Sequence, residues 1–248
     1  MEWERDMHTT LPRRPDRAAD IRTRVEAVDW AGVSAHLDGH GWAMLTTLLT
    51  ADECESIARL YDDDRRFRSH VLMGRHGFGR GEYKYFNYPL PDLIERLRTE
   101  FYSRLVPIAN RWSGTSYPEK HADFLRGCHE AGQTRATPLL LKYGVDDYNC
   151  LHQDLYGEHV FPLQLAILLA RPGEDFTGGE FVMTEQRPRM QSRPMVVPLR
   201  QGDGVVFAVH KRLVQGTRGT YRVNMRHGVS RIRSGERYTL GIIFHDAN

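Results

Sequence analysis

His152 and Asp154 have the residue types and the spacing to bind one metal ion from a single strand. Side chains two residues apart on a strand point to the same face, and an imidazole nitrogen and a carboxylate oxygen are both metal ligands. On a helix, side chains two residues apart diverge by about 200° around the axis. Two further His-x-Asp pairs lie in helical patterns, where we expect surface residues or helix caps: His36–Asp38 and His121–Asp123.

The pair at His152 also belongs to a longer ordered series. Tyr143 precedes His152 by nine residues, and Arg237 follows His227 by ten residues. Two glycine-rich segments, residues 178–181 and 202–207, stand between the two histidines. This order resembles the iron(II)- and 2-oxoglutarate-dependent dioxygenases, and the resemblance covers about residues 139–244.

The resemblance implies a role for each residue of the series. His152, Asp154 and His227 would bind Fe(II) on one face, which leaves positions open for 2-oxoglutarate and O₂. Arg237 would bind the distal carboxylate of 2-oxoglutarate, because a guanidinium offers a carboxylate two parallel donors. Tyr143 would donate a hydrogen bond to the same cosubstrate. The implied enzyme hydroxylates a C–H bond and releases succinate and CO₂.

Two branches of this superfamily share features with the chain. Tyr143, nine residues before a His-Gln-Asp sequence, resembles the AlkB-type enzymes that demethylate alkylated nucleobases. Leu141 stands where those enzymes have an asparagine, and the ten residues from His227 to Arg237 are typical of the prolyl-hydroxylase-like branch. Residues 177–248 resemble most closely a bacterial group described as oxygenases for oxidative demethylation of damaged DNA. The resemblance therefore implies demethylation of nucleobases in DNA or RNA.

Two alternatives remain open at this stage. A prolyl-hydroxylase-like enzyme would hydroxylate a protein side chain or a small metabolite with the same metal chemistry. A cupin-like metal-binding module would need no catalysis at all. Such a binding module has no use for an arginine ten residues after His227.

The charge distribution favours an anionic partner. The whole chain carries a net charge of +2, but residues 187–237 hold 12 lysines and arginines against two acids. Such a basic segment attracts polyanions. We expect phosphate contacts from three residues near a turn at residues 216–219 and from one in a second hairpin after Glu185: Arg218, Arg222, Arg226 and Arg189. Alternatively, these arginines cover strand edges, where positive charge discourages aggregation.

Tyr83 and Tyr85 lie in an aromatic segment rich in glycine. A flipped or single-stranded base stacks on such rings, so these two tyrosines are candidates for substrate binding. The competing interpretation, which the frequency of aromatic residues in strand interiors favours, is that both rings pack in the core.

Hydrophobic periodicity predicts helices before residue 113. Apolar residues at helical spacing predict one helix from Arg17 to about Leu37, followed by a short strand at residues 42–48. Thr50 and Glu53 form a capping box that begins a helix ending near residue 62. Residues 93–112 predict the longest helix, which we expect Pro107 to kink or end early.

After about residue 137 the pattern changes to short strands separated by turns. The expected strands are Leu139–Tyr143, Leu163–Leu169, Gly179–Met183, Met195–Val197, Val205–Val209, Tyr221–Met225 and Tyr238–Phe244. They predict an α+β fold: a double-stranded β-helix, or jelly roll, with a helical N-terminal half packed against it. We expect one structural domain with a flexible arm (1–15), a supporting region (16–136) and a catalytic core (137–248).

Composition excludes several classes of protein. With 40% hydrophobic and 27% charged residues, the chain is typical of globular proteins. No apolar run approaches the roughly 20 residues of a membrane helix, and residues 1–14 lack the apolar centre of a signal peptide. Three cysteines outside CxxC spacing favour neither a disulfide framework nor a zinc finger. We therefore expect a cytoplasmic protein without a membrane partner, while its oligomeric state stays open.

Overall fold

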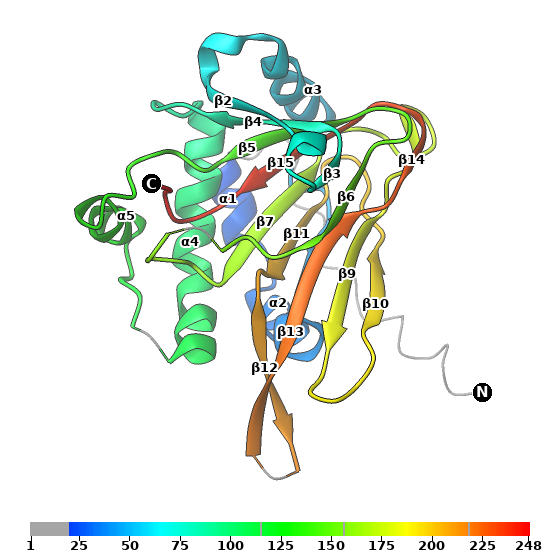
Figure 1. Ribbon diagram of the computed structural model, residues 1–248. Helices are drawn as coiled ribbons and strands as arrows, with labels where there is room; N and C mark the ends of the chain where they lie inside the picture. Colours follow the sequence, from blue (N-terminus) through cyan, green and yellow to red (C-terminus); the bar gives the residue numbers. More distant parts are fainter. Residues whose placement is uncertain (1–19, 115, 156, 218) are drawn as a thin grey trace.

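The computed structural model describes residues 20–114, 116–155, 157–217 and 219–248 (Figure 1). The predicted arm, residues 1–15, lies outside them. The helices among the described residues are α1 (Ile21–Glu26), α2 (Trp30–His40), α3 (Ala51–Arg59), α4 (Asp92–Ser113) and α5 (His121–Glu130). Three short 3₁₀ helices accompany them: η1 (Leu60–Asp62), η2 (Asp64–Arg66) and η3 (Met73–Arg75).

The long helix α4 continues through Pro107, so the expectation that it ends there is wrong. Pro107 cannot donate a hydrogen bond to Ser103, four residues earlier. Both residues are exposed, however, so the free carbonyl of Ser103 meets water. The opposite face of α4 is buried and holds the helix in place.

The expected single helix from Arg17 to Leu37 is also wrong, since α1 ends at Glu26 and α2 begins at Trp30. Asp29 causes the break. Its carboxylate accepts a hydrogen bond of 2.9 Å from the backbone N–H of Gly32, which caps the second helix. By contrast, the capping box of Thr50 and Glu53 forms as predicted at the start of α3.

Two antiparallel sheets form the core. The first has seven strands in the order β1-β11-β7-β15-β5-β4-β2. Their bounds are β1 (Trp42–Leu45), β11 (Gly204–Ala208), β7 (Leu163–Leu168), β15 (Arg237–Ile242), β5 (Leu139–Tyr143), β4 (Glu82–Phe86) and β2 (Phe67–Leu72). Every residue of β7 and β11 is buried, because helices cover the outer face of this sheet and the inner face lines the interior.

The second sheet has six strands, in the order β10-β9-β13-β6-β3 with β12 on β13. Their bounds are β10 (Arg193–Val197), β9 (Phe181–Gln186), β13 (Gly219–Val229), β6 (Tyr148–His152), β3 (Gly79–Arg80) and β12 (Lys211–Gly216). A two-stranded sheet joins β14 (Ile232–Gly235) to β8 (Phe176–Gly178).

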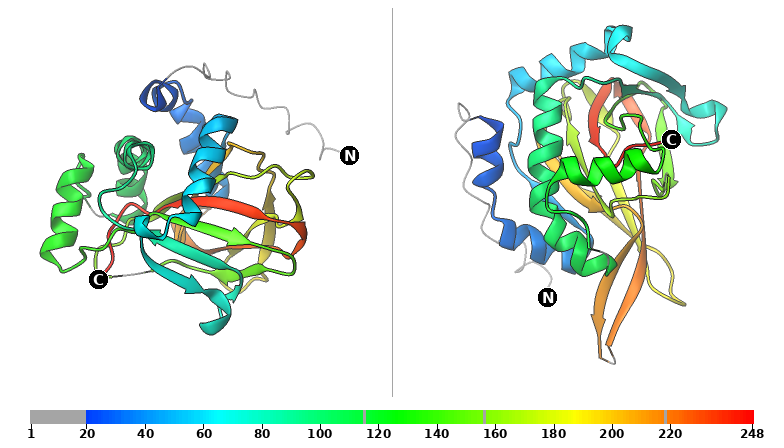
Figure 2. Two further views of the ribbon diagram at one scale, coloured as in Figure 1. Left: turned by 90° about the horizontal axis from the view of Figure 1, so that it is seen from above. Right: turned by 90° about the vertical axis from the view of Figure 1, so that its left-hand side faces the viewer.

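The arrangement is the predicted jelly roll with helices packed against one side. Figure 2 shows the helices gathered on one side of the sheets and the β12–β13 hairpin projecting beyond them. All seven predicted core strands exist, with ends shifted by a few residues. None of the described helices is long and apolar enough to cross a membrane.

Candidate metal centre

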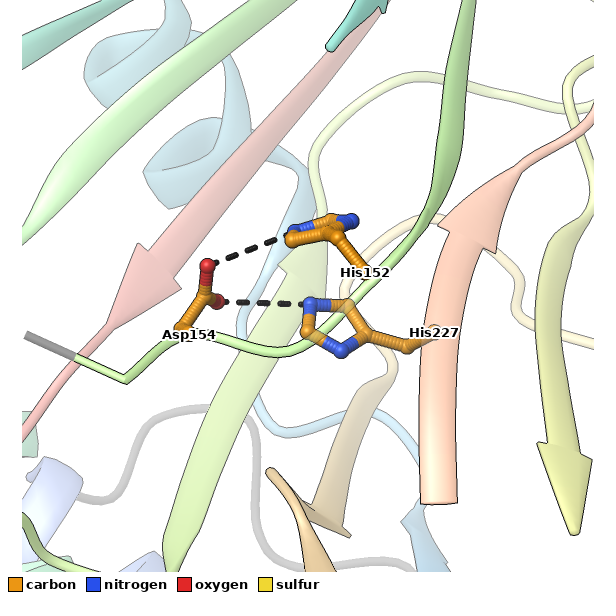
Figure 3. Close-up of side chains that lie close together, drawn as sticks. All are labelled: His152, Asp154 and His227. Atoms are coloured by element: carbon orange, nitrogen blue, oxygen red, sulfur yellow. Dashed lines mark ion pairs between the residues drawn. The ribbon is translucent and has the colours of Figure 1, made fainter. Parts of the chain in front are cut away.

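Strand pairing brings the predicted metal ligands together. His152 is the last residue of β6, and its cross-strand partner on β13 is His227. Asp154 follows two residues after β6 ends, and its carboxylate faces both rings from one side (Figure 3). Its Oδ1 lies 3.3 Å from Nε2 of His152, and its Oδ2 lies 3.4 Å from Nε2 of His227.

Neighbouring groups orient the two imidazole rings. Nδ1 of His152 lies 2.8 Å from the carbonyl oxygen of Cys150. Because only a protonated Nδ1 can donate to a carbonyl, Nδ1 is occupied, and Nε2 is the nitrogen that faces Asp154 and is placed to bind a metal. The ring of His227 lies 4.6 Å from the Phe207 ring and 6.1 Å from the Phe181 ring, centroid to centroid. These aromatic walls hold His227 in one position.

The electrostatics of the triad suit a divalent cation. Burial raises the pKa of Asp154, but hydrogen bonds from His152 and His227 outweigh it and bring that pKa well below its ordinary value. Burial lowers the pKa of His227, and the neighbouring His152 lowers it further. The site thus offers a carboxylate and a neutral imidazole. The three ligand atoms lie within 4.8 Å of one another, and the donor set fits Fe(II).

A second polar cluster surrounds Arg237. Its cross-strand partner is Tyr143, and the guanidinium carbon lies 5.6 Å from the centre of that ring. Arg237 donates a 2.6 Å hydrogen bond to the hydroxyl of Thr239, and the amide of Asn149 lies 3.3 Å from the Tyr143 hydroxyl. Tyr143, Thr239 and Asn149 thus form a group of neutral polar residues beside the buried cation.

Arg237 is 1% exposed, and none of the described carboxylates forms an ion pair with it, although the charge of Glu180 acts on it from farther away. Its Nε has no hydrogen-bond partner within the described chain. Burial lowers the pKa of Arg237 to about 10, which still leaves the guanidinium charged at neutral pH. A buried, unpaired cation is costly, and a carboxylate of a bound molecule fits the place of the absent counter-ion.

One cavity of about 240 Å³ joins the triad to the Arg237 cluster. Residues from both sheets line it, including Tyr83 and Tyr85 of β4, whose rings lie 5.4 Å apart edge to face. The guanidinium of Arg68 lies 4.5 Å from the centre of the Tyr85 ring. Both tyrosines are half-buried cavity walls, so neither is fully enclosed in the core.

The predicted phosphate-binding arginines lie away from this cavity. Arg222 and Arg226 are exposed and alternate along β13 with buried residues such as His227, so they face the outer side of the second sheet. Arg189 is exposed in the turn between β9 and β10. Arg218 lies outside the described residues.

Several residues that line the cavity are not among those predicted from the sequence. Phe207, Gln164, Asn149 and Thr239 all line the cavity. Gln164 had a signal in the sequence, because it is a single polar residue within an apolar run of six. Phe207 had none, since nothing in its own segment distinguishes a cavity wall from core.

Comparison with known proteins identifies the class. The sequence profile of one family matches residues 81–247, more than half of the chain. That family is described as "Oxygenase, catalysing oxidative methylation of damaged DNA". The chain belongs to this oxygenase family. The oxygenase is also 50% identical over 191 residues to the uncharacterized protein Rv2227 of Mycobacterium tuberculosis, which covers 74% of this chain and 82% of that one.

Solved structures share the fold of the oxygenase. A prolyl-4-hydroxylase from Pseudomonas putida matches with a TM-score of 0.51 and 13% identity, over 88% of this chain and 99% of that one. The non-heme alpha-ketoglutarate-dependent epimerase SnoN matches with a TM-score of 0.52 and 15% identity, over 86% and 80%. These matches confirm the predicted jelly roll. The fold and the triad both agree with the predicted Fe(II), 2-oxoglutarate and O₂.

Proposed function

We propose that His152, Asp154 and His227 hold Fe(II) in this oxygenase and that Arg237 binds 2-oxoglutarate. The observation that carries the proposal is the placement of both clusters in one cavity. The triad supplies the ligands of a non-heme iron site with open positions. Arg237, buried without a carboxylate partner within the described chain, supplies the charge that a dicarboxylate requires.

When bound, iron with 2-oxoglutarate and O₂ supplies the oxidant that inserts oxygen into a C–H bond. The residues of the chain bind and orient the cosubstrate, and they exclude water from the cavity. Arg237 and the Tyr143 hydroxyl fix one end of the cosubstrate and direct its other end toward the triad. The apolar walls, among them Leu141, Phe181 and Phe207, keep water from the reacting atoms.

The substrate that we propose is an N-methylated nucleobase in DNA or RNA. The family description, which names damaged DNA, supports it. Hydroxylation of an N-methyl carbon places a hydroxyl on that carbon. The N–C bond then breaks, the carbon leaves as formaldehyde, and the nitrogen regains a proton. One oxidation therefore restores the base. Tyr83 and Tyr85 offer ring faces at the cavity for a base turned out of its stack.

Alanine at His152 or His227 tests the iron site. Each change removes one ligand, so we expect loss of Fe(II) binding and of Fe(II)-dependent succinate formation from 2-oxoglutarate. Circular dichroism should show an intact fold. His36→Ala, in a helical His-x-Asp pair, is the matched control and should keep full activity. Full activity in both ligand variants would refute the assignment.

Formaldehyde release tests the substrate. The purified oxygenase would be given Fe(II), 2-oxoglutarate and oligonucleotides with single methylated bases, beside unmethylated strands of the same sequence. We expect formaldehyde from a methylated strand and none from the matched strand. Succinate formation stimulated by a proline-containing peptide, with no formaldehyde from any strand, would instead support the prolyl-hydroxylase-like alternative.

A further inference from the structure

Gln164 is a buried polar residue whose amide nitrogen, Nε2, has no hydrogen-bond partner among the described residues. It lies in β7, in an apolar strand that is buried throughout. The residue is 4% exposed. Burying an amide donor without a partner is unfavourable. An unpartnered amide N–H at the wall of a cavity points to a ligand that accepts its hydrogen bond.

The sheet places this amide beside the triad. Gln164 lines the cavity, and its cross-strand partner on β11 is Phe207, whose ring contacts the ring of His227. Ala166, two residues further on the same face, pairs with Gly241 of β15. Both residues also line the cavity.

Arg237 enters the same cavity from another part of the sheet. It lies four residues before Gly241 on β15, whereas Gln164 lies two residues before the partner of Gly241 on the antiparallel strand β7. Because the strands are antiparallel, Arg237 and Gln164 lie on opposite sides of the Gly241–Ala166 pair. They are six residues apart, which is about 20 Å along the strands. The amide thus belongs to the part of the cavity remote from the cosubstrate's distal carboxylate.

The charges of the cavity restrict what can bind there. Among the described residues that line the cavity, Asp154 is the single carboxylate. Its two oxygens face His152 and His227. A positively charged base would therefore meet no counter-charge in this part of the cavity. Burying an unpaired charge is unfavourable, so the cavity favours an uncharged group with a hydrogen-bonding edge.

We propose that Gln164 donates a hydrogen bond to an oxo group of an uncharged methylated base, and that the oxygenase prefers such lesions to cationic ones. N3-methylthymine is an uncharged lesion with two oxo groups. N1-methyladenine and N3-methylcytosine carry a positive charge at neutral pH. This inference rests on the proposed demethylation of nucleobases and specifies the class of base.

Thermal stability separates a binding role from a structural one. Gln164→Leu removes an amide that lacks a partner, so the apo protein should melt at the same temperature as the wild type or higher. Gln133 is the matched control. It is fully buried, donates to the carbonyls of His159 and Asp246, and accepts from two backbone N–H groups. Gln133→Leu should lower the melting temperature. A comparable drop in Gln164→Leu would overturn the proposal.

Turnover of three oligonucleotides tests the preference. The probes are identical single strands that carry N3-methylthymine, N1-methyladenine or N3-methylcytosine, and formaldehyde is measured. We expect the wild type to favour N3-methylthymine. Gln164→Leu should lower its kcat/KM for that strand about tenfold, as the loss of one hydrogen bond does, without changing the KM for 2-oxoglutarate.

The outcomes distinguish the two proposals. Faster turnover of either cationic lesion, or an unchanged kcat/KM in Gln164→Leu, would overturn the role of Gln164 and leave demethylation standing. No formaldehyde from any of the three strands, with active succinate formation, would overturn demethylation itself.

Discussion

At the scale of single residues, Arg237 leads to a prediction about the cosubstrate. Its guanidinium is buried and without an ion pair in the described chain. Truncating one partner of a buried charge pair costs roughly 2–5 kcal/mol. Because each 1.4 kcal/mol is a factor of ten, Arg237→Ala should raise the KM for 2-oxoglutarate by roughly 30-fold or more. Steady-state rates of succinate formation at a series of 2-oxoglutarate concentrations give this KM.

The melting temperature of Arg237→Ala shows whether the guanidinium lacks a counter-ion until 2-oxoglutarate binds. Without 2-oxoglutarate, Arg237→Ala should melt no lower than the wild type, because it removes a desolvated charge. Adding 2-oxoglutarate should raise the melting temperature of the wild type alone. Arg233→Ala is the control, since Arg233 is exposed and close in sequence. If Arg233→Ala raises the KM and Arg237→Ala does not, the anchor has been assigned to the wrong residue.

At the scale of elements, the hairpins β9–β10 and β12–β13 carry less unpaired positive charge than their arginine and lysine content suggests. Glu185 is 2% exposed and forms ion pairs with Arg187, Arg193 and Arg212. Burial raises the pKa of Glu185, but the hydrogen bond from Arg212 and that from Arg187 outweigh it and lower it overall. Three of the twelve bases thus anchor the hairpins internally. Arg222 and Arg226 remain exposed on the outer face of β13.

These two arginines support a prediction about nucleic-acid binding. If they contact phosphates, changing both to Gln should flatten the dependence of log affinity on log salt by about 1.4, roughly 0.7 per contact on a single strand. Fluorescence anisotropy of a labelled oligonucleotide measures the slope. Arg59→Gln with Arg65→Gln, two exposed arginines near α3, is the charge-matched control. Equal slopes in the two double variants would exclude a specific role for β13.

The elements also show where sequence reasoning succeeds and fails. The strand at Leu139–Tyr143 and the ligands on and after β6 follow from local signals, namely a short strand-forming run followed by a turn and ligand types at a fixed spacing. The break before Trp30 depends on one side-chain cap. The persistence of α4 through Pro107 depends on the packing of its buried face against elements that are distant in the sequence, among them α1 and β15. The position of Phe207 in the cavity wall depends on how the strands pair. That register cannot be read from a single sequence.

At the scale of the whole molecule, a buried ion pair joins the C-terminal segment to the helices. Arg98 of α4 and Asp246 are both fully buried, and Nη2 lies 2.7 Å from Oδ1. Arg98 also donates to the carbonyls of Ile243 and His245. The segment after β15 is thereby fixed against α4. These contacts fix the chain just after β15, the strand that begins at Arg237.

Asp246→Asn therefore tests how far the fold depends on this pair. The change keeps the shape but leaves the buried Arg98 without its counter-charge, which costs roughly 3–5 kcal/mol. In a domain of this size, that loss corresponds to a melting temperature lower by roughly 10 °C. Glu26→Gln breaks the exposed Arg22–Glu26 pair and should leave the melting temperature nearly unchanged, because solvent screens an exposed pair. Calorimetry measures both variants. Because Asp246 lies outside the cavity, the KM for 2-oxoglutarate at 25 °C should stay within about twofold of the wild type. A melting temperature equal to that of Glu26→Gln would show that the pair adds no net stability and that packing alone fixes the C-terminal segment.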